Sequence, residues 1–173
     1  MNDIQTAFFQ LCLLAQALQA TGHYNVFTLI EGLRHMLTQN IFFYGTLVAH
    51  SPTGDPSHVF YNLKTDPLPH ELVYVQLGAG YPKEMRAPHW CYVVTVNGQK
   101  LMVIPVTSIK YDSGEPHSPY EMDIIEQDGV RGRLHFDDMR SIDKMRVIEK
   151  KHYREVLTSR EGIMDALDRY LKA

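Results

Sequence analysis

The spacing of apolar residues changes from three and four to two near residue 40, and this change limits the fold more than any other feature. Before it, residues 4–18 and 26–37 each carry an apolar stripe at helical spacing, and Gly22 separates the two runs. We expect two helices joined by a short link as an antiparallel hairpin. Their stripes are expected in the core or at a dimer interface; the alternative is that the hairpin covers a binding groove.

Beyond residue 40, short β-rich runs separated by turn-forming residues predict strands. These runs are 41–49, 59–63, 72–77, 90–96, 100–106, 121–126 and 132–136. Asn97-Gly98 predicts a hairpin with a type I′ turn, and Asp128-Gly129 is a weaker signal of the same kind.

A third helix is expected at the C-terminal end of the sequence. Thr158-Ser159-Arg160-Glu161 fits the capping box S/T-x-x-E, and an apolar stripe follows it. The element order indicates an α+β fold, mainly β, with a small SH3-like antiparallel barrel flanked by the N-terminal hairpin and this helix. The proline-containing break at 65–69 divides the chain into an extension, 1–66, holding the hairpin and two strands, and a barrel domain, 67–173.

Composition excludes several classes of protein. With 173 residues, of which 45% are apolar and 21% charged, the chain suits a globular protein with a real core, not a disordered or coiled-coil one. Cys12 and Cys91 have apolar neighbours, which predicts buried free thiols. No apolar run reaches the roughly 18 residues of a membrane span, so we expect a soluble cytoplasmic protein without a membrane partner.

Charge is distributed unevenly along the chain. The formal net charge is −3, but residues 131–154 hold eight Lys and Arg against four acids, a net of +4, whereas residues 1–70 have a net of −2. A basic segment beside strands can contact phosphates. The alternative, which we favour on charge alone, is a solvated face of alternating charge.

Two neighbouring segments hold the side chains best suited to catalysis. The glycine-containing loop within 77–92 carries Lys83, Glu84, Arg86 and His89, and the predicted strand 100–106 is followed by Thr107, Ser108 and Lys110. Imidazole and carboxylate groups move protons near neutral pH, and hydroxyls with cations hold phosphates. Metal-binding spacings such as H-x-x-x-H are absent from the nine histidines, and so are G-x-S-x-G, P-loop and G-x-G-x-x-G motifs.

Three sequence blocks resemble the PemK/MazF family of toxin endoribonucleases from bacterial toxin–antitoxin pairs. They are residues 71–78 (ELVYVQLG), 103–108 (VIPVTS) and 137–144 (DDMRSIDK), and the match extends over about residues 69–150. The family usually has Gly-x-Arg-Pro before its second strand. Here Ala87-Pro88-His89-Trp90 places His89 at the position of a residue that is commonly catalytic in the family.

The resemblance implies a PemK-type barrel and metal-independent, cofactor-free cleavage of single-stranded RNA, with the ribose 2′-OH as nucleophile. Weighed with the chemistry of the side chains, it makes His89, Glu84, Thr107, Ser108 and Arg86 the catalytic candidates, although the alignment does not place Arg86 at the family's Arg position. The candidates for RNA binding are Lys83, Lys110, His135, Asp137 and Tyr81. An exposed Tyr81 or Trp90 could stack a base, and for Trp90 we favour the core. Arg140 and Asp143 are expected to form an ion pair that braces the fold.

The same resemblance implies three kinds of partner: mRNA as substrate, a neutralising antitoxin, and a second copy in a homodimer. One alternative is a non-catalytic, growth-inhibitory or regulatory protein-binding module on the same barrel. Another is an inactive descendant whose helical hairpin binds a partner. The position of His89 separates these alternatives, because a catalytic His89 must lie near Thr107 and Ser108 and be open to a substrate.

Overall fold

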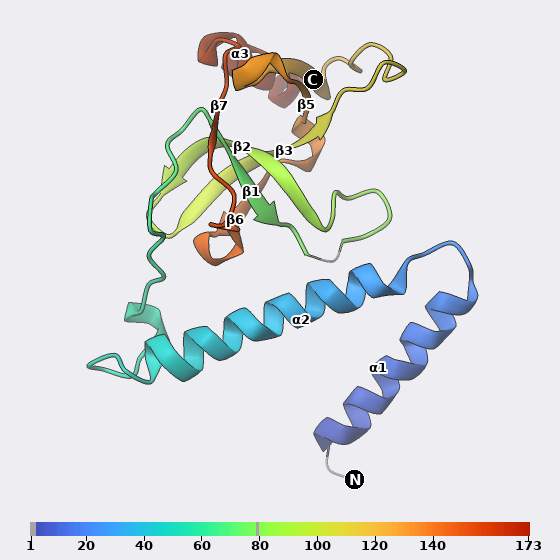
Figure 1. The fold of residues 1–173 in the computed structure, drawn as a ribbon, viewed down its shortest axis with the longest axis vertical. Helices are drawn as coiled ribbons and strands as arrows, with labels where there is room; N and C mark the ends of the chain where they lie inside the picture. The colour runs from blue at the N-terminus through green and yellow to red at the C-terminus, as the bar shows by residue number, and fades with distance from the viewer. Residues whose placement is uncertain (1–2, 79) are drawn as a thin grey trace.

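The computed structural model describes residues 3–78 and 80–173, which form an antiparallel sheet with helices on either side (Figure 1). The α-helices are α1 (Asp3–Ala20), α2 (Val26–Phe42) and α3 (Arg160–Lys172). The strands are β1 (Glu71–Gln76), β2 (Pro88–Asn97), β3 (Lys100–Ser108), β4 (Glu121–Ile125), β5 (Arg131–His135), β6 (Arg140–Asp143) and β7 (Arg154–Glu155).

The seven strands form one curled antiparallel sheet. Its order is β4-β5-β3-β2-β1-β7, and β6 pairs with the other half of β3. A bridge between Glu126 and Val156, together with a 2.7 Å hydrogen bond from Leu157 N to Ile125 O, joins the two ends of this path. The sheet therefore curls into a small barrel, which removes most of its free edge.

Alternation along the strands produces two apolar clusters, one on each face of the sheet. Leu72, Tyr92 and Ile104 belong to the first cluster, which α3 covers with Ile163 and Leu167. The second contains the intervening residues of the same strands and reaches β6. The expected α+β fold, mainly β, with a small antiparallel barrel and a C-terminal helix, is confirmed.

The central strands agree with the sequence prediction, but the two expected before residue 66 are wrong. Residues 41–49 continue the helical path of α2 through its last turn and a π-helical segment, Phe43–Val48, and 59–63 form no strand. A short apolar run is ambiguous between helix and strand, and no proline interrupts the chain before Pro52. The prediction missed β6 and β7, which have only four and two residues.

The irregular segment before β1 packs on the barrel. Leu63 is buried in the second cluster, the Lys64 amide donates to Glu149 Oε2 at 2.8 Å, and Lys144 Nζ lies 2.7 Å from Asp66 Oδ1. These contacts join residues 61–66 to the barrel. The expected boundary at residue 66 stays a prediction.

Of three turns and caps signalled by the sequence, two differ in detail from the prediction. In the β2–β3 hairpin the turn residues are Gly98 and Gln99, and of these two only Gly98 has a positive φ (57°), the type II′ pattern and not type I′. Asp128 and Gly129 both have positive φ in the β4–β5 turn, as expected. The N-cap of α3 is Ser159, one residue later than expected, because the Thr158 hydroxyl accepts from the Ile125 amide instead.

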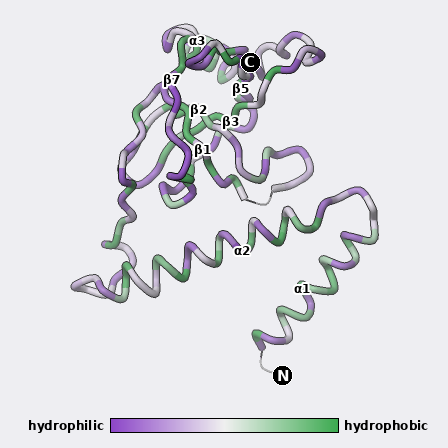
Figure 2. The backbone as a smooth tube through the Cα atoms, viewed as in Figure 1, coloured by the Kyte–Doolittle hydropathy of each residue, from purple (hydrophilic) through white to green (hydrophobic). Residues whose placement is uncertain are grey.

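The N-terminal hairpin is not part of the core. Figure 1 shows α1 splayed away from α2 and from the barrel, and no described residue of α1 is buried. Apolar positions recur along the exposed α1, as Figure 2 shows, so the expected place of this stripe in the core is wrong, whereas its alternative place at a dimer interface stays a prediction. Within residues 3–78 and 80–173, the α1 stripe belongs to neither of the two buried apolar clusters. Cys12 is exposed within the chain, contrary to the expected burial. Cys91 is buried as expected, and burial raises the pKa of its thiol to about 12.

None of the described helices is both long and apolar enough to span a membrane.

Candidate functional site

A pocket of about 600 Å³ lies where β2 begins and β3 ends. Among the residues that line it are Tyr74, His89, Trp90, Thr107, Ser108 and Lys110. Four of the ten side chains singled out from the sequence therefore share one pocket. They come from two segments of the chain that the β2–β3 pairing brings together.

The strand register explains why His89 lies near Thr107. In β2 and β3, Trp90 pairs with Val106 and Cys91 with Pro105, so the next step of this register places His89 opposite Thr107. Side chains opposite each other on antiparallel strands share a face, with their Cβ atoms about 5 Å apart. An imidazole and a hydroxyl thus face the same end of the pocket.

A second histidine lies behind Thr107 and does not line the pocket. His135 Nε2 is 2.8 Å from Thr107 Oγ1, and His135 Nδ1 is 3.4 Å from Glu121 Oε1. The β4–β5 register pairs Glu121 directly with His135. Hydroxyl, imidazole and carboxylate therefore form a row that leads from the pocket into the sheet.

The surroundings of His135 favour a neutral ring. Desolvation by burial lowers the pKa of His135, against the opposing effect of the acidic side chains of Glu121, Asp137 and Asp138. With the ring proton on Nδ1 toward Glu121, the lone pair of Nε2 accepts the hydrogen bond of the Thr107 hydroxyl. This is the protonation state that a base acting through Thr107 requires.

His89 is half-buried in the wall of the pocket. Its Nδ1 atom is buried and has no hydrogen-bond partner among the residues that the structure describes. Buried polar atoms without a partner are uncommon in native proteins, and each calls for an explanation. The ring therefore lies in the pocket without the second polar contact that usually fixes a structural histidine.

The other sequence candidates lie outside the lining of this pocket. Glu84 accepts from the Tyr81 amide at 3.1 Å within its own loop, and Arg86 stacks on Tyr24 at 4.6 Å. Lys83, Tyr81 and Asp137 are exposed on loops or short helical turns. Within the part of the chain that the structure describes, neither a hydrogen bond nor an ion pair joins Glu84 to His89.

Asp138 anchors the loop before β2. Its carboxylate accepts from the Met85 amide at 3.1 and 3.2 Å and lies 2.6 Å from Arg140 Nη2. The expected ion pair between Arg140 and Asp143 is therefore wrong, since Asp143 instead accepts from the Met145 amide. The anchor fixes the approach of the chain to His89.

The basic segment 131–154 is mostly neutralised by local acids. Arg133 binds Asp123 at 2.6 Å, Arg154 binds Glu126 at 2.8 Å, and the Lys144 pair with Asp66 was described above. Arg133 also donates to the carbonyls of residues 113–115, which holds the loop beside the pocket. The interpretation of alternating charge is therefore the better one for this segment.

Glu121 is the functional candidate that the sequence analysis missed. A signal for it was present: a hairpin centred on Asp128 pairs residue 121 with residue 135, and β4 and β5 have this register. Tyr74 was missed as well, because it lies inside an apolar strand whose pattern reads as core.

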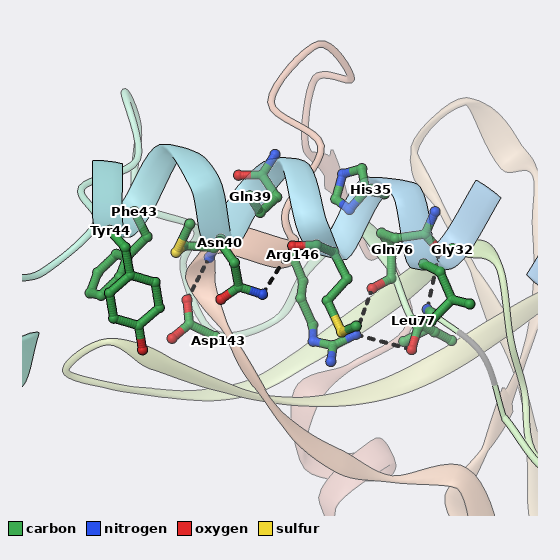
Figure 3. A pocket seen from close by; sticks show the side chains of 14 residues that line it. Gly32, His35, Gln39, Asn40, Phe43, Tyr44, Gln76, Leu77, Asp143 and Arg146 are labelled. Atoms are coloured by element: carbon green, nitrogen blue, oxygen red, sulfur yellow. Dashed lines mark hydrogen bonds between the residues drawn. The ribbon is translucent and has the colours of Figure 1, made fainter. Parts of the chain in front are cut away.

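A second cavity, of about 460 Å³, lies between α2 and the barrel (Figure 3). Arg146 projects into it and donates to the carbonyls of Gln76 and Leu77 at 3.2 and 3.1 Å. α2 contributes to this cavity and to none of the lining of the pocket at His89. The hairpin does not cover that pocket.

The described residues contain no cluster of His, Cys, Asp or Glu suited to hold a metal ion.

Comparisons with known proteins were made against family models, curated proteins and solved structures. No family model and no curated protein matches the chain. Among solved structures, the chain is similar to an endoribonuclease in complex with its cognate antitoxin from a mycobacterial species, at 16% identity and a TM-score of 0.42. The similarity covers 61% of this chain and 91% of that one. The function of this chain is therefore inferred from its own pocket and motifs.

Proposed function

We propose that this chain is a toxin endoribonuclease that cleaves single-stranded RNA without a metal ion, by attack of a ribose 2′-OH on the adjacent phosphate. One observation carries the proposal: the Thr107 hydroxyl is bonded to His135 and lies, by strand register, opposite His89 at one pocket. The buried Nδ1 atom of His89 has no hydrogen-bond partner among the described residues. Two imidazoles on either side of a hydroxyl supply both halves of the proton transfer that this reaction needs.

The proposed steps balance without a cofactor. The 2′-OH proton passes through Thr107 to His135 Nε2 while the O2′–P bond forms, and protonated His89 donates to the departing O5′ as the P–O5′ bond breaks. The products are a 2′,3′-cyclic phosphate and a 5′-hydroxyl. Ser108 and Lys110, exposed at the same pocket, stabilise the charge that develops on the phosphate oxygens.

The partners follow from the same proposal. We expect a cytoplasmic protein, since its mRNA substrate is there, neutralised by a cognate antitoxin and assembled as a homodimer. The three motif blocks support the toxin assignment, and the exposed apolar side chains of α1 and α2 offer surface for protein contacts.

RNA cleavage in EDTA tests the proposal. We expect wild type to cut mixed RNA to cyclic-phosphate ends, and an RNA with a 2′-deoxy sugar at the cleaved position to stay intact. His89→Ala and Thr107→Val should each slow cleavage by about 10²–10⁴-fold, the usual effect of losing a proton-transfer group. His58→Ala, which changes an exposed histidine far along the chain from the pocket residues, is the matched control.

Undiminished cleavage by His89→Ala would remove His89 from the mechanism. Wild-type protein freed of antitoxin that leaves every RNA intact would favour the non-catalytic binding module instead.

A further inference from the structure

An aromatic pair borders the pocket beside the proposed catalytic groups. Tyr74 of β1 and Trp90 of β2 are cross-strand partners, with ring centroids 5.2 Å apart and planes tilted by 55°. Both rings are half-buried and both line the pocket. Trp90 also packs against the first apolar cluster, which fixes one side of the pair.

Two cations accompany these rings. The Arg154 guanidinium carbon lies 3.9 Å from the Trp90 centroid, and Lys151 Nζ lies 5.9 Å from the Tyr74 centroid. Glu126, which is almost fully buried, holds Arg154 in place at 2.8 Å. Lys151 is exposed and forms no ion pair with any residue that the structure describes. Its charge is therefore free to meet an anion.

The pocket reaches both faces of the sheet. Alternation along β2 turns Trp90 to the face opposite that of His89, and the pocket includes both because it lies at the ends of β2 and β3. A strand of nucleic acid with one phosphate at His89 and Thr107 would present a neighbouring base to Tyr74 and Trp90. Aromatic rings with adjacent cations suit a flat base attached to an anionic backbone.

We propose that Tyr74 and Trp90 form a nucleobase subsite and that Lys151 binds the backbone phosphate of the same nucleotide. This inference rests on the proposed function, because it extends the same pocket along the RNA. It names the ligand as a single-stranded nucleic acid, whose unpaired bases can leave the stack and bind an aromatic face.

The chain has one tryptophan, so fluorescence reports on the subsite directly. The probe is a mixed-sequence single-stranded DNA oligonucleotide, which lacks the 2′-OH and cannot be cleaved by the proposed reaction. We expect saturable quenching of Trp90 by this probe. Tyr74→Leu should weaken binding about 10- to 100-fold, whereas Tyr74→Phe should stay within about twofold of wild type, because stacking needs the ring and not the hydroxyl.

Salt dependence tests Lys151 separately. Lys151→Ala should lower the slope of log affinity against log salt by about 0.7 to 1, the effect of losing one phosphate contact. Tyr44→Leu, which removes an exposed tyrosine at the other cavity, should leave both affinity and slope unchanged. Circular dichroism of each variant checks that the barrel remains folded.

The two proposals can fail independently. If RNA is cleaved but the oligonucleotide leaves Trp90 fluorescence unchanged, or Tyr74→Leu binds as wild type does, the subsite is overturned and the nuclease stands. If the oligonucleotide quenches Trp90 fluorescence and Tyr74→Leu weakens oligonucleotide binding, while no RNA is cleaved, the subsite stands and the nuclease fails.

Discussion

At the scale of single residues, the pocket depends on which side chains share a face of the sheet. The Thr107 hydroxyl is bonded to the His135 ring, whose other nitrogen faces Glu121. All three side chains are half-buried. Burial lowers the pKa of His135, and the carboxylate of Glu121 opposes that effect. Removing the charge of Glu121 is therefore expected to change the pKa of His135.

Glu121→Gln should move the pH profile of cleavage. Because the Glu121 charge raises the pKa of His135, removing it lowers that pKa further. A base must be neutral to act, so the acidic limb of kcat/KM against pH should shift to lower pH. Glu155→Gln, which changes an exposed carboxylate on β7, should leave the profile in place. A shift to higher pH, or none, would exclude His135 as the base.

At the scale of elements, the loop between β1 and β2 is bound by a side chain from the short helical turn, Phe136–Asp138, that joins β5 to β6. Asp138 bonds the Met85 amide and Arg140 from a largely buried position, with 13% of its side chain exposed. The loop is otherwise rich in turn residues and exposed from 81 to 84. This carboxylate therefore adds a side-chain anchor to the backbone hydrogen bonds between Leu77, Gly78 and Ala87 at the base of the loop.

Asp138→Ala should lower the free energy of unfolding by about 2–4 kcal/mol, because Arg140 and the Met85 amide lose their partner. Urea denaturation measures this change, and cleavage by trypsin at Lys83 or Arg86 should become faster. Asp168→Ala removes an exposed i,i+4 pair with Lys172 and should cost less than about 1 kcal/mol. Equal stability of the two variants would show that Asp138 is not an anchor.

At the scale of the whole molecule, the N-terminal hairpin is the least satisfied part. α1 exposes apolar side chains on several sides, among them Phe8 at 56% and Leu14 at 67%. A helix that is apolar around its circumference is normally buried. The proposed homodimer would give this surface a partner.

Phe8→Glu combined with Leu14→Glu should convert the dimer to a monomer, because two charges per helix would have to be buried in the interface. Light scattering after size-exclusion chromatography measures the mass. Leu171→Glu, at an exposed apolar position of α3, is the control and should leave the mass unchanged. A wild-type monomer, or a double variant that stays dimeric, contradicts an interface through α1.

Local signals in the sequence located the central strands, the β2–β3 and β4–β5 hairpins and the three helices, because period and turn chemistry act over a few neighbouring residues. The same signals failed at residues 41–49, where a short apolar run suits helix and strand alike. They also failed at α1, since a stripe predicts burial without saying whether the chain holds a surface to bury it.

The candidate site divides in the same way. The sequence by itself determined which chemical groups are present, and it selected His89, Thr107, Ser108 and Lys110 from their positions at the ends of predicted strands. The tertiary structure alone showed that His135 and Glu121 lie behind Thr107, and that Tyr74 lies beside Trp90. It also showed that Glu84 and Arg86 lie outside the lining of the pocket. The reason is physical: residue types and local spacing are fixed by the chain, whereas register, sheet curvature and ion pairing depend on segments that meet only after folding.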